Sequence, residues 1–318
     1  MVRKLLLASP RGYCAGVERA VETVERALEL YGTPVYVRKQ IVHNLHVVRE
    51  LEERGAIFVE EETEVPEGST VVFSAHGVAP KVHENAARLQ LNTIDATCPL
   101  VTKVHVQARR YAASGYTVVL IGHAGHEEVV GTMGEAPDSI VLVESAGDVA
   151  RLEFPPDAKL AYITQTTLSV DETQDVIAAL RERFPSIYAP KKEDICYATS
   201  NRQWAVKEML NEIDLLLVIG SRNSSNSNRL VEVARANGVE SYLIDDESEI
   251  DEAWLEGHEV CGITAGASAP EKLVTRVCDW FRVRGVEDIE PYRLVSEDVE
   301  FRLPVELRRE LALAAEQA

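Results

Sequence analysis

One structural unit occurs three times along the chain, and this repeat limits the possible folds more than any single motif does. In each copy, a cysteine ends a short extended segment and precedes a stretch whose apolar positions follow helical spacing. Strand-like and helix-like segments then alternate, and two polar loops follow strands. The interval from the cysteine to the first polar loop agrees to within one residue in all three copies. The cysteines that begin the copies are Cys14, Cys98 and Cys196.

Strands that alternate with helices favour parallel sheets, so we expect an α/β fold with three repeated domains and mainly parallel sheets. Ligands of such sheets bind beyond the carboxyl ends of the strands. Three sheets about a pseudo-three-fold axis would direct the three cysteines and the polar loops into one central cavity. The predicted domains are residues 1–94, 95–192 and 193–283, followed by a non-repeating C-terminal tail, residues 284–318.

The charge of the chain limits its partners. A formal net charge of -19 argues against a nucleic-acid-binding protein, which needs a basic surface. Any anion site must therefore be local and built from neutral donors, histidines and helix N-termini. No segment approaches the roughly 20 apolar residues of a membrane span. The first residues are typical of a strand and not of a secretory signal, so we expect a cytoplasmic protein with reduced thiols.

Three thiolates at one site would form a soft ligand set, which suits an iron–sulfur cluster or zinc. A helix N-terminus also favours the thiolate form of a nearby cysteine. Three cysteines would leave one iron of a four-iron cluster without a protein ligand, and an open metal position is typical of catalytic sites. The alternative is that all three are small core residues. For two other cysteines, Cys261 and Cys278, we expect that alternative.

Six side chains in the polar loops could bind an anion through neutral donors at strand ends or helix starts. A hydrogen bond to a charged group contributes about 1.5–3 kcal/mol, so about six to eight of them could hold a diphosphate without lysine or arginine. The simpler alternative is that the serines and asparagines only cap helices. The six residues are His43, His76, Ser224, Ser225, Asn226 and Ser268.

Glu128 shares a loop with His126, and its neighbour Glu127 is the only other acid in the polar loops. The carboxyl group of Glu128 could donate protons if desolvation raises its pKa. The alternative is a solvated surface glutamate, which is common in so acidic a chain. Four other histidines fall within helices or near a turn and receive no predicted role: His46, His83, His105 and His258.

Several segments of the chain resemble the signature motifs of the 4-hydroxy-3-methylbut-2-enyl diphosphate reductase family, which catalyses the last step of the non-mevalonate isoprenoid pathway. The resemblance covers about residues 4 to 283 and departs from the family pattern at no functional position. The segments that carry it are Pro10–Gly16, Asp95–Val101, Gly122–His126, Thr164–Val170, Asp194–Thr199 and Asn223–Asn228.

The resemblance implies a trefoil of three α/β domains around one [4Fe–4S] cluster per chain, bound by Cys14, Cys98 and Cys196. The substrate hydroxyl group would bind the open iron. Two electrons and two protons would remove this hydroxyl group as water and leave isopentenyl and dimethylallyl diphosphates. An electron donor such as ferredoxin or flavodoxin is the implied partner, beside the small allylic diphosphate substrate.

The resemblance also implies roles for individual residues. Glu128 matches the proton donor of the family. Thr166 matches a threonine on the substrate side of the site and is expected to take part in catalysis. The residues that match the substrate-binding positions are His43, His76, His126, Thr166, Thr167, Ser224, Ser225, Asn226 and Ser268.

The residues alone leave two other classes of protein open. One is a zinc hydrolase of phosphate esters, with a histidine beside the three cysteines at the metal. The other is an electron-transfer or sensor protein whose cluster does no substrate chemistry. A brown protein with about four iron and four sulfide per chain would exclude zinc. A pure electron carrier has no need for six polar loops around its metal.

Overall fold

The computed structural model of the chain describes residues 2–317. Met1 and Ala318, the outer ends of the predicted first domain and of the predicted tail, lie outside the described residues. Two compact units make up the fold. Unit 1 comprises residues 2–17, 43–49 and 197–300, and unit 2 comprises residues 18–42, 50–196 and 301–317. Among residues 2–317, no helix is both long and apolar enough to cross a membrane.

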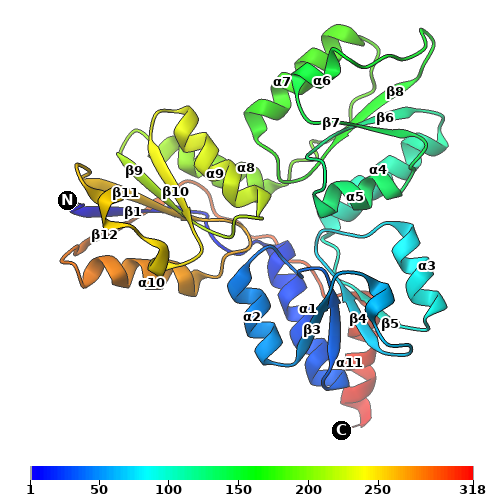
Figure 1. Ribbon diagram of the computed structural model, residues 1–318, viewed down its shortest axis with the longest axis horizontal. Helices are drawn as coiled ribbons and strands as arrows, with labels where there is room; N and C mark the ends of the chain where they lie inside the picture. The colour runs from blue at the N-terminus through cyan, green and yellow to red at the C-terminus, as the bar shows by residue number, and fades with distance from the viewer. Residues whose placement is uncertain (1, 318) are drawn as a thin grey trace. The chain divides into compact units, whose positions relative to one another are not determined.

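Unit 1 is built on one parallel sheet, sheet A, with the strand order β10-β9-β11-β1-β12. Helix α10 covers one face, and α8 and α9 cover the other (Figure 1). Strand β9 is therefore apolar and buried at every position, as expected of a parallel strand with no face open to water. The elements are β1 (Lys4–Ser9), α8 (Tyr197–Met209), β9 (Leu215–Ile219), α9 (Ser225–Ala236), β10 (Glu240–Ile244), η2 (Glu247–Glu249), η3 (Glu252–Leu255), β11 (Val260–Ala265), α10 (Glu271–Arg282) and β12 (Asp288–Arg293).

Strand β1 pairs with strands outside its own predicted domain. The repeat places residues 4–9 in the first predicted domain, whereas β1 pairs with β11, in the third predicted domain, and with β12, in the predicted tail. Leu5 packs in the core on the α10 side, and Leu6 packs on the α8 side. Because β1 is buried on both faces, its place depends on neighbours that are distant in sequence, which local periodicity cannot identify.

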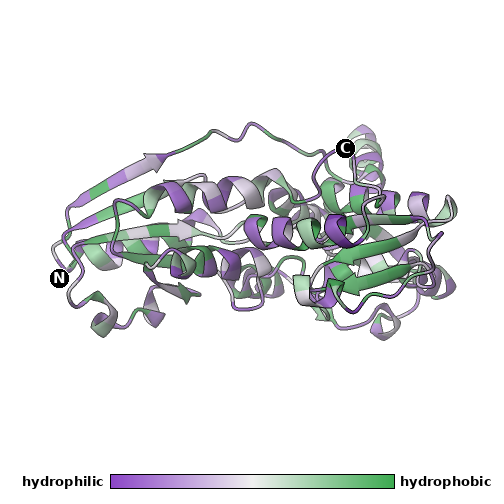
Figure 2. Cartoon of the chain, turned by 90° about the horizontal axis from the view of Figure 1, so that it is seen from above, coloured by the Kyte–Doolittle hydropathy of each residue, from purple (hydrophilic) through white to green (hydrophobic). Residues whose placement is uncertain are grey.

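Unit 2 contains two smaller parallel sheets, sheet B with the order β3-β2-β4-β5 and sheet C with the order β7-β6-β8. Apolar strands alternate with helices that are polar on their outer faces (Figure 2). The predicted α/β class with parallel sheets is confirmed. The elements are β2 (Val35–Arg38), β3 (Ala56–Val59), η1 (Glu62–Glu64), β4 (Thr70–Phe73), α3 (Pro80–Arg88), β5 (Asn92–Asp95), α4 (Pro99–Ala113), β6 (Thr117–Ile121), α5 (Glu127–Gly134), β7 (Ile140–Val143), α6 (Ala146–Val149), β8 (Leu160–Thr164), α7 (Val170–Arg183) and α11 (Val305–Gln317).

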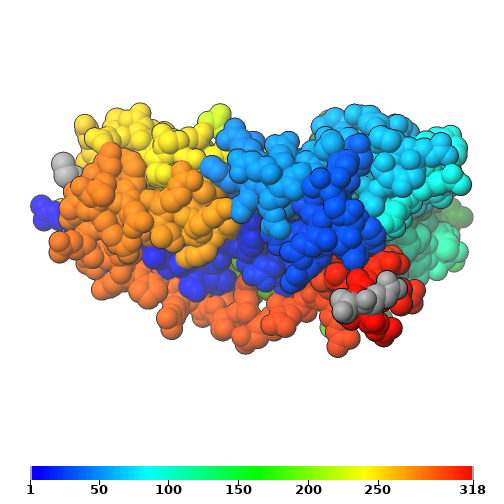
Figure 3. Space-filling view, turned by 90° about the horizontal axis from the view of Figure 1, so that it is seen from below, coloured from blue at the N-terminus to red at the C-terminus, as the bar shows by residue number. Residues whose placement is uncertain are grey.

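Two helices have their first residues in unit 1 and the rest in unit 2: α1 (Ala15–Tyr31) and α2 (Leu45–Glu53). Within unit 2, the tail packs against α1, and Figure 3 shows α11 in red beside the blue residues of α1. The buried Arg19 donates to the carbonyl oxygens of Arg302 and Ala96, each at 2.8 Å. Leu307 is completely buried. The helix at the end of the tail, α11, therefore packs against the rest of unit 2.

Candidate functional site

The three repeat cysteines lie where the sequence predicts, directly before a helix. Cys14 precedes α1, Cys98 is the N-cap of α4, and Cys196 precedes α8. All three are partly exposed, whereas Cys261 and Cys278 are buried in the core of unit 1. Three thiols are therefore partly accessible, and two are buried. The prediction that Cys261 and Cys278 are core residues is confirmed.

Backbone hydrogen bonds fix the Cys14 loop to the loop that follows β11 in unit 1. The N–H of Gly12 donates to the carbonyl oxygen of Ala265 at 3.0 Å, and the N–H of Cys14 donates to that of Ala267 at 3.2 Å. Gly12 has a φ of +67°, and a Cβ there would lie 3.1 Å from the carbonyl oxygen of Ala269. The tight approach of the two loops therefore requires glycine at this position.

Although Cys14 is partly exposed, the desolvation of its thiol affects its pKa more than the helix N-terminus does. Burial raises the pKa of the Cys14 thiol, while the positive charge of Arg202 and the N–H groups of Val17 and Gly16 oppose this rise. The predicted preference for the thiolate is therefore present but outweighed in the protein alone. A coordinated metal cation would reverse the balance, because it deprotonates the thiol that it binds.

Hydrogen bonds join several predicted anion-binding residues within unit 1. The hydroxyl group of Ser268 donates to the carbonyl oxygen of His43 at 2.8 Å. The side-chain nitrogen of Asn223 lies 3.3 Å from Nδ1 of His43. Oδ1 of Asn226 accepts from the N–H of Ala267 at 2.9 Å. The loops after β9 and β11 and the segment around His43 therefore form one connected polar group.

Three of the predicted residues, Ser224, Ser225 and Asn226, lie at the start of helix α9. Ser224 is its N-cap and accepts hydrogen bonds from the N–H of Ser227 at 3.3 Å and from the Ser227 hydroxyl group at 3.0 Å. The capping interpretation is therefore correct for Ser224. Ser225 is the first residue of the helix. The N–H groups of a first helical turn lack partners inside the helix, so such a turn can bind an anion in addition to being capped.

In unit 2, contacts connect the predicted residues Cys98, His76, His126 and Glu128. The N–H of Cys98 donates to the carbonyl oxygen of Ala75 at 3.0 Å, which places Cys98 beside the His76 loop. The rings of His76 and His126 meet edge to face, with 6.0 Å between their centroids. Nδ1 of His126 accepts from the N–H of Glu128 at 3.2 Å. Residues from sheets B and C therefore meet in this unit.

Glu128 is buried, with 2% of its surface exposed, so the interpretation as a surface glutamate is wrong. Its carboxylate oxygens accept from the N–H of Thr166 at 2.6 Å and from the hydroxyl group of Thr166 at 2.9 Å. The carbonyl oxygen of Thr166 in turn accepts from the N–H of Cys196 at 3.0 Å. A single residue therefore connects the candidate proton donor to a candidate metal ligand.

The surroundings of Glu128 keep its proton available near neutral pH. Burial raises the pKa of Glu128 to about 7, although the two hydrogen bonds from Thr166 lower it. The negative charge of Asp194 adds a smaller rise. An acid whose pKa lies near the working pH is suited to general acid catalysis, because it both holds a proton and releases it readily.

Burial favours the neutral form of His76, whereas the neighbouring Glu127 carboxylate favours the charged form. Burial lowers its pKa to about 4, well below the ordinary value for histidine. Nδ1 of His76 lies 3.2 Å from a carboxylate oxygen of Glu127. A neutral imidazole binds an anion as a hydrogen-bond donor and not as a cation, so His76 fits the predicted set of neutral donors.

Thr167 is held by the buried Gln165. The side-chain nitrogen of Gln165 donates to the hydroxyl oxygen of Thr167 at 2.9 Å, and its carbonyl oxygen accepts from the N–H of His123 at 3.1 Å. Gln165 therefore ties the loop after β8 to the loop after β6. Sequence analysis finds both loops through their motifs, but it assigns no role to the glutamine that joins them.

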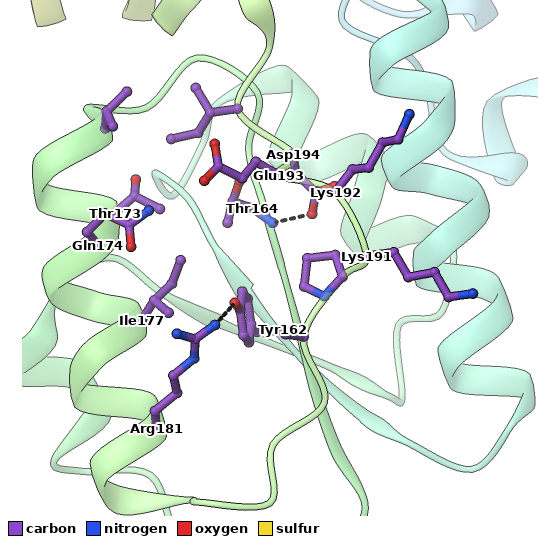
Figure 4. A pocket seen from close by; sticks show the side chains of 14 residues that line it. Tyr162, Thr164, Thr173, Gln174, Ile177, Arg181, Lys191, Lys192, Glu193 and Asp194 are labelled. Carbon is purple, nitrogen blue, oxygen red and sulfur yellow. Dashed lines mark hydrogen bonds between the residues drawn. The ribbon is translucent and has the colours of Figure 1, made fainter.

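Asp194, two residues before Cys196, is a buried carboxylate. It accepts from the N–H of Thr164 at 3.3 Å and pairs with Lys103 at 2.9 Å. Burial raises its pKa, and Lys103 opposes this rise. Asp194 also lines a cavity of about 270 Å³ in which Arg181 donates to the hydroxyl oxygen of Tyr162 at 3.2 Å (Figure 4). No predicted site residue is among the described residues that line this cavity, so it is separate from the candidate site.

His105, which has no predicted role, supports the His76 loop. It is 5% exposed, and its Nδ1 lies 2.8 Å from a carboxylate oxygen of Glu135, directly after α5. Its ring lies against Gly77, where a Cβ would be 2.9 Å from Cε1 of the imidazole. His105 therefore lies between the helix that carries Glu128 and the loop that carries His76. A single histidine on the apolar face of a helix gives no sequence signal for such a role.

Replacement of Gly77 by Ala should destabilise the protein more than replacement of Gly115. The two glycines have φ values of +80° and +77°, so both alanines pay about 1–2 kcal/mol of backbone strain. Only at Gly77 does the new Cβ meet His105, which adds about 1–3 kcal/mol, whereas a Cβ at Gly115 meets nothing within 4 Å. Thermal unfolding of both variants tests this, and equal losses would contradict the packing role of His105.

Comparison with known proteins places the chain in a family. The family described as LytB protein matches residues 5–282. A 4-hydroxy-3-methylbut-2-enyl diphosphate reductase of Streptomyces avermitilis is 59% identical over 314 residues, covering 98% of this chain and 93% of the relative. The enzyme of the same name from Acidothermus cellulolyticus is 61% identical over 315 residues, covering 99% and 93%.

Solved structures agree with these relatives. The structure of the E-1-hydroxy-2-methyl-but-2-enyl-4-diphosphate reductase from Plasmodium falciparum matches with a TM-score of 0.95 and 38% identity, covering 100% of this chain and 99% of that one. A second structure, of (E)-4-hydroxy-3-methyl-but-2-enyl diphosphate reductase, matches with a TM-score of 0.62 and 31% identity, covering 89% of this chain. The chain therefore belongs to the LytB family, the family of the 4-hydroxy-3-methylbut-2-enyl diphosphate reductases.

Proposed function

We propose that the chain reduces (E)-4-hydroxy-3-methylbut-2-enyl diphosphate to isopentenyl and dimethylallyl diphosphates. The allylic C–O bond breaks, two electrons are consumed, one proton leaves with the hydroxyl group as water, and a second proton adds to carbon. The observation that carries this proposal is the buried Glu128, whose pKa of about 7 and contact with Thr166, the neighbour of Cys196, suit a proton donor beside a metal.

The cysteines of the chain fit a cluster with one open iron. Cys14, Cys98 and Cys196 would hold one [4Fe–4S] cluster, since their thiols are soft ligands and partly exposed. Cys261 and Cys278 cannot supply a fourth ligand, because both are enclosed by apolar side chains in the core of unit 1. When bound, such a cluster would supply electrons and an open iron for the substrate oxygen.

Neutral donors would bind the diphosphate group. Hydrogen bonds to a charged group contribute about 1.5–3 kcal/mol each, which offsets the repulsion expected from an acidic chain. The low pKa of His76 keeps this residue among the neutral donors. The proposed binders are His43, His76, His126, Thr166, Thr167, Ser224, Ser225, Asn226 and Ser268.

Glu128 and Thr166 would move the protons. A protonated Glu128 can pass its proton to the leaving hydroxyl group directly or through the hydroxyl group of Thr166, 2.9 Å away. Hydroxide is a poor leaving group, so its departure needs a donor of this kind. Burial of both residues also excludes water, which would otherwise compete for the proton.

The electrons must come from outside the chain. We propose an electron-carrier protein such as ferredoxin or flavodoxin as the donor, because the reaction consumes two electrons. A reducing cytoplasm suits three partly exposed thiols that must stay unoxidised to bind iron.

Anaerobic purification followed by assay tests the proposed function. We expect a brown protein with about four iron and four sulfide per chain that converts the hydroxylated C5 diphosphate when a chemical reductant is supplied. A colourless zinc protein that hydrolyses phosphate esters, or an iron–sulfur protein that does not consume this substrate, would contradict the proposal.

Ser268→Ala should weaken substrate binding more than turnover. The Ser268 side chain is a neutral donor in the polar group of unit 1, and its loss should cost about 1–3 kcal/mol of binding free energy. Calorimetric titration of the loaded enzyme with substrate measures this change. Ser296→Ala, at an exposed serine of the same unit, is the control, and unchanged affinity in Ser268→Ala would remove this residue from the proposed site.

A further inference from the structure

Arg202, in helix α8 of unit 1, is a cation with no exposed surface. Its Nη2 donates to the carbonyl oxygens of Gly12 at 2.6 Å and of Tyr13 at 3.3 Å, and its Nε donates to Gly12 at 3.2 Å. Its Nη1 donates to Glu297 at 3.1 Å and to Ala198 at 2.9 Å. The guanidinium group thus bonds the two residues that directly precede Cys14.

The C-terminal segment reaches Arg202 by following β1. Strand β12 pairs with β1 over its whole length, as Figure 1 shows at the edge of sheet A. The N–H of Leu294 continues this pairing by donating to the carbonyl oxygen of Ser9 at 2.9 Å. Three residues later, Glu297 meets Arg202 and accepts from the side chain of Asn201 at 3.0 Å. The tail therefore runs alongside β1, the strand that leads to Cys14, and its residue Glu297 reaches the buried Arg202.

The Arg202–Glu297 pair differs from the surface ion pairs of unit 1. The side chains of Arg202 and Glu297 are 0% and 13% exposed, whereas those of Arg276 and Glu247 are 46% and 23% exposed. A buried cation is retained only where acceptors surround it, and removal of one partner leaves a charge without compensation. Among the described residues, Glu297 is the carboxylate that pairs with Arg202, so loss of Glu297 should loosen the hold on the guanidinium group.

We propose that Arg202, locked by Glu297, is a positioning residue that holds the Cys14 loop ready for metal binding. The segment of the tail up to Glu297 is then part of the support of the metal site. This inference rests on the proposed function, since it assigns Arg202 and Glu297 to the support of a cluster ligand. Partners that orient a metal ligand commonly change metal affinity by about 10–100-fold when they are replaced.

The test compares Glu297→Ala, Arg202→Lys and Arg202→Gln with the control Arg276→Gln in the anaerobically loaded enzyme. We expect Glu297→Ala and Arg202→Lys to lose iron to a chelator about tenfold faster than the unmodified enzyme. Arg202→Gln removes a positive charge near the cluster and should also shift its midpoint potential to a more negative value. Arg202→Lys keeps the charge, so its potential should stay near that of the unmodified enzyme. The control should match the unmodified enzyme in both measurements.

Two outcomes separate this inference from the proposed function. If the unmodified chain binds no iron–sulfur cluster, the proposed function fails, and the support role fails with it. If the unmodified chain carries the cluster but Glu297→Ala keeps iron and potential unchanged, only the role of Arg202 and Glu297 is wrong. Should Arg202→Gln fail to fold, Glu297→Ala and Arg202→Lys decide the question, because both leave a partner for the buried carbonyl groups.

Discussion

Cys98→Ser should abolish stable binding of the cluster and turnover, while Cys278→Ala should leave both intact. A serine hydroxyl group is a hard, weakly acidic ligand that replaces a thiolate poorly on iron. The fold should survive, because Cys98 is the N-cap of α4 without a side-chain capping bond, and serine is a favoured N-cap. Cys278 is 3% exposed in the core of unit 1 and contributes packing alone.

Iron and sulfide analysis of the purified variants measures the effect, with circular dichroism to check the fold. We expect the same loss in Cys14→Ser and Cys196→Ser, since all three cysteines hold matched positions before helices. An intact cluster with normal activity in Cys98→Ser would overturn the assignment of the three ligands. Loss of iron in Cys278→Ala, with the fold intact, would do the same for the separation of accessible from structural thiols.

Local sequence patterns were sufficient to predict the helix starts after the three cysteines and the polar loops after the strands. The starts of α1, α4 and α8 follow from helical spacing after each cysteine, and the polar loops follow from apolar strands that end in serine, asparagine or histidine. These features depend on neighbours within one turn or one strand. The cap at Ser224 is of this kind, because its partner Ser227 lies in the same turn.

Features that depend on distant residues could not be predicted. The partners of β1 are β11 and β12, which lie far away in sequence, and no periodicity in residues 4–9 indicates them. His105 and Arg202 support the loops of His76 and Cys14 through contacts that cross the fold. The burial of Glu128 belongs to the same class, because it results from the packing of α5 against the loop that carries Thr166.

The acidic net charge of the chain makes uncharged groups favourable beside an anionic substrate, and burial favours the uncharged form of an acid or a histidine. A formal charge of -19 repels a diphosphate, and a cationic site would partly offset this. The proposed binders are instead hydroxyl groups, amides and histidines such as His76, whose neutral form burial favours, and burial raises the pKa of the proposed proton donor Glu128 to about 7. Neutral donors and a neutral acid avoid like charge beside the substrate without a cluster of lysine and arginine.

Glu128→Gln should yield a folded, brown protein that binds substrate but turns over about 10²-fold more slowly or worse. Glutamine keeps the shape of the side chain and one carbonyl oxygen for the N–H of Thr166, which donates at 2.6 Å to Glu128. The amide cannot release a proton, so only the transfer step is lost. Glu172→Gln, at an exposed acid in the first turn of α7, is the control and should be fully active.

The pH dependence provides the second test of Glu128. Burial raises its pKa from the ordinary 4.5 to about 7, so the proton is held below about pH 7 and lost above it. Turnover of the unmodified enzyme should therefore fall as the pH rises through 7, and this decline should be absent in the residual activity of Glu128→Gln.

Between pH 4.5 and pH 7, Glu128 holds a proton in the folded protein that it releases in the unfolded chain, so the free energy of unfolding that this residue contributes falls as the pH rises. Glu128→Gln should consequently be at least as stable to heat as the unmodified enzyme at pH 8. Normal turnover in this variant, or a loss explained by missing iron, would show that Glu128 does not donate the proton.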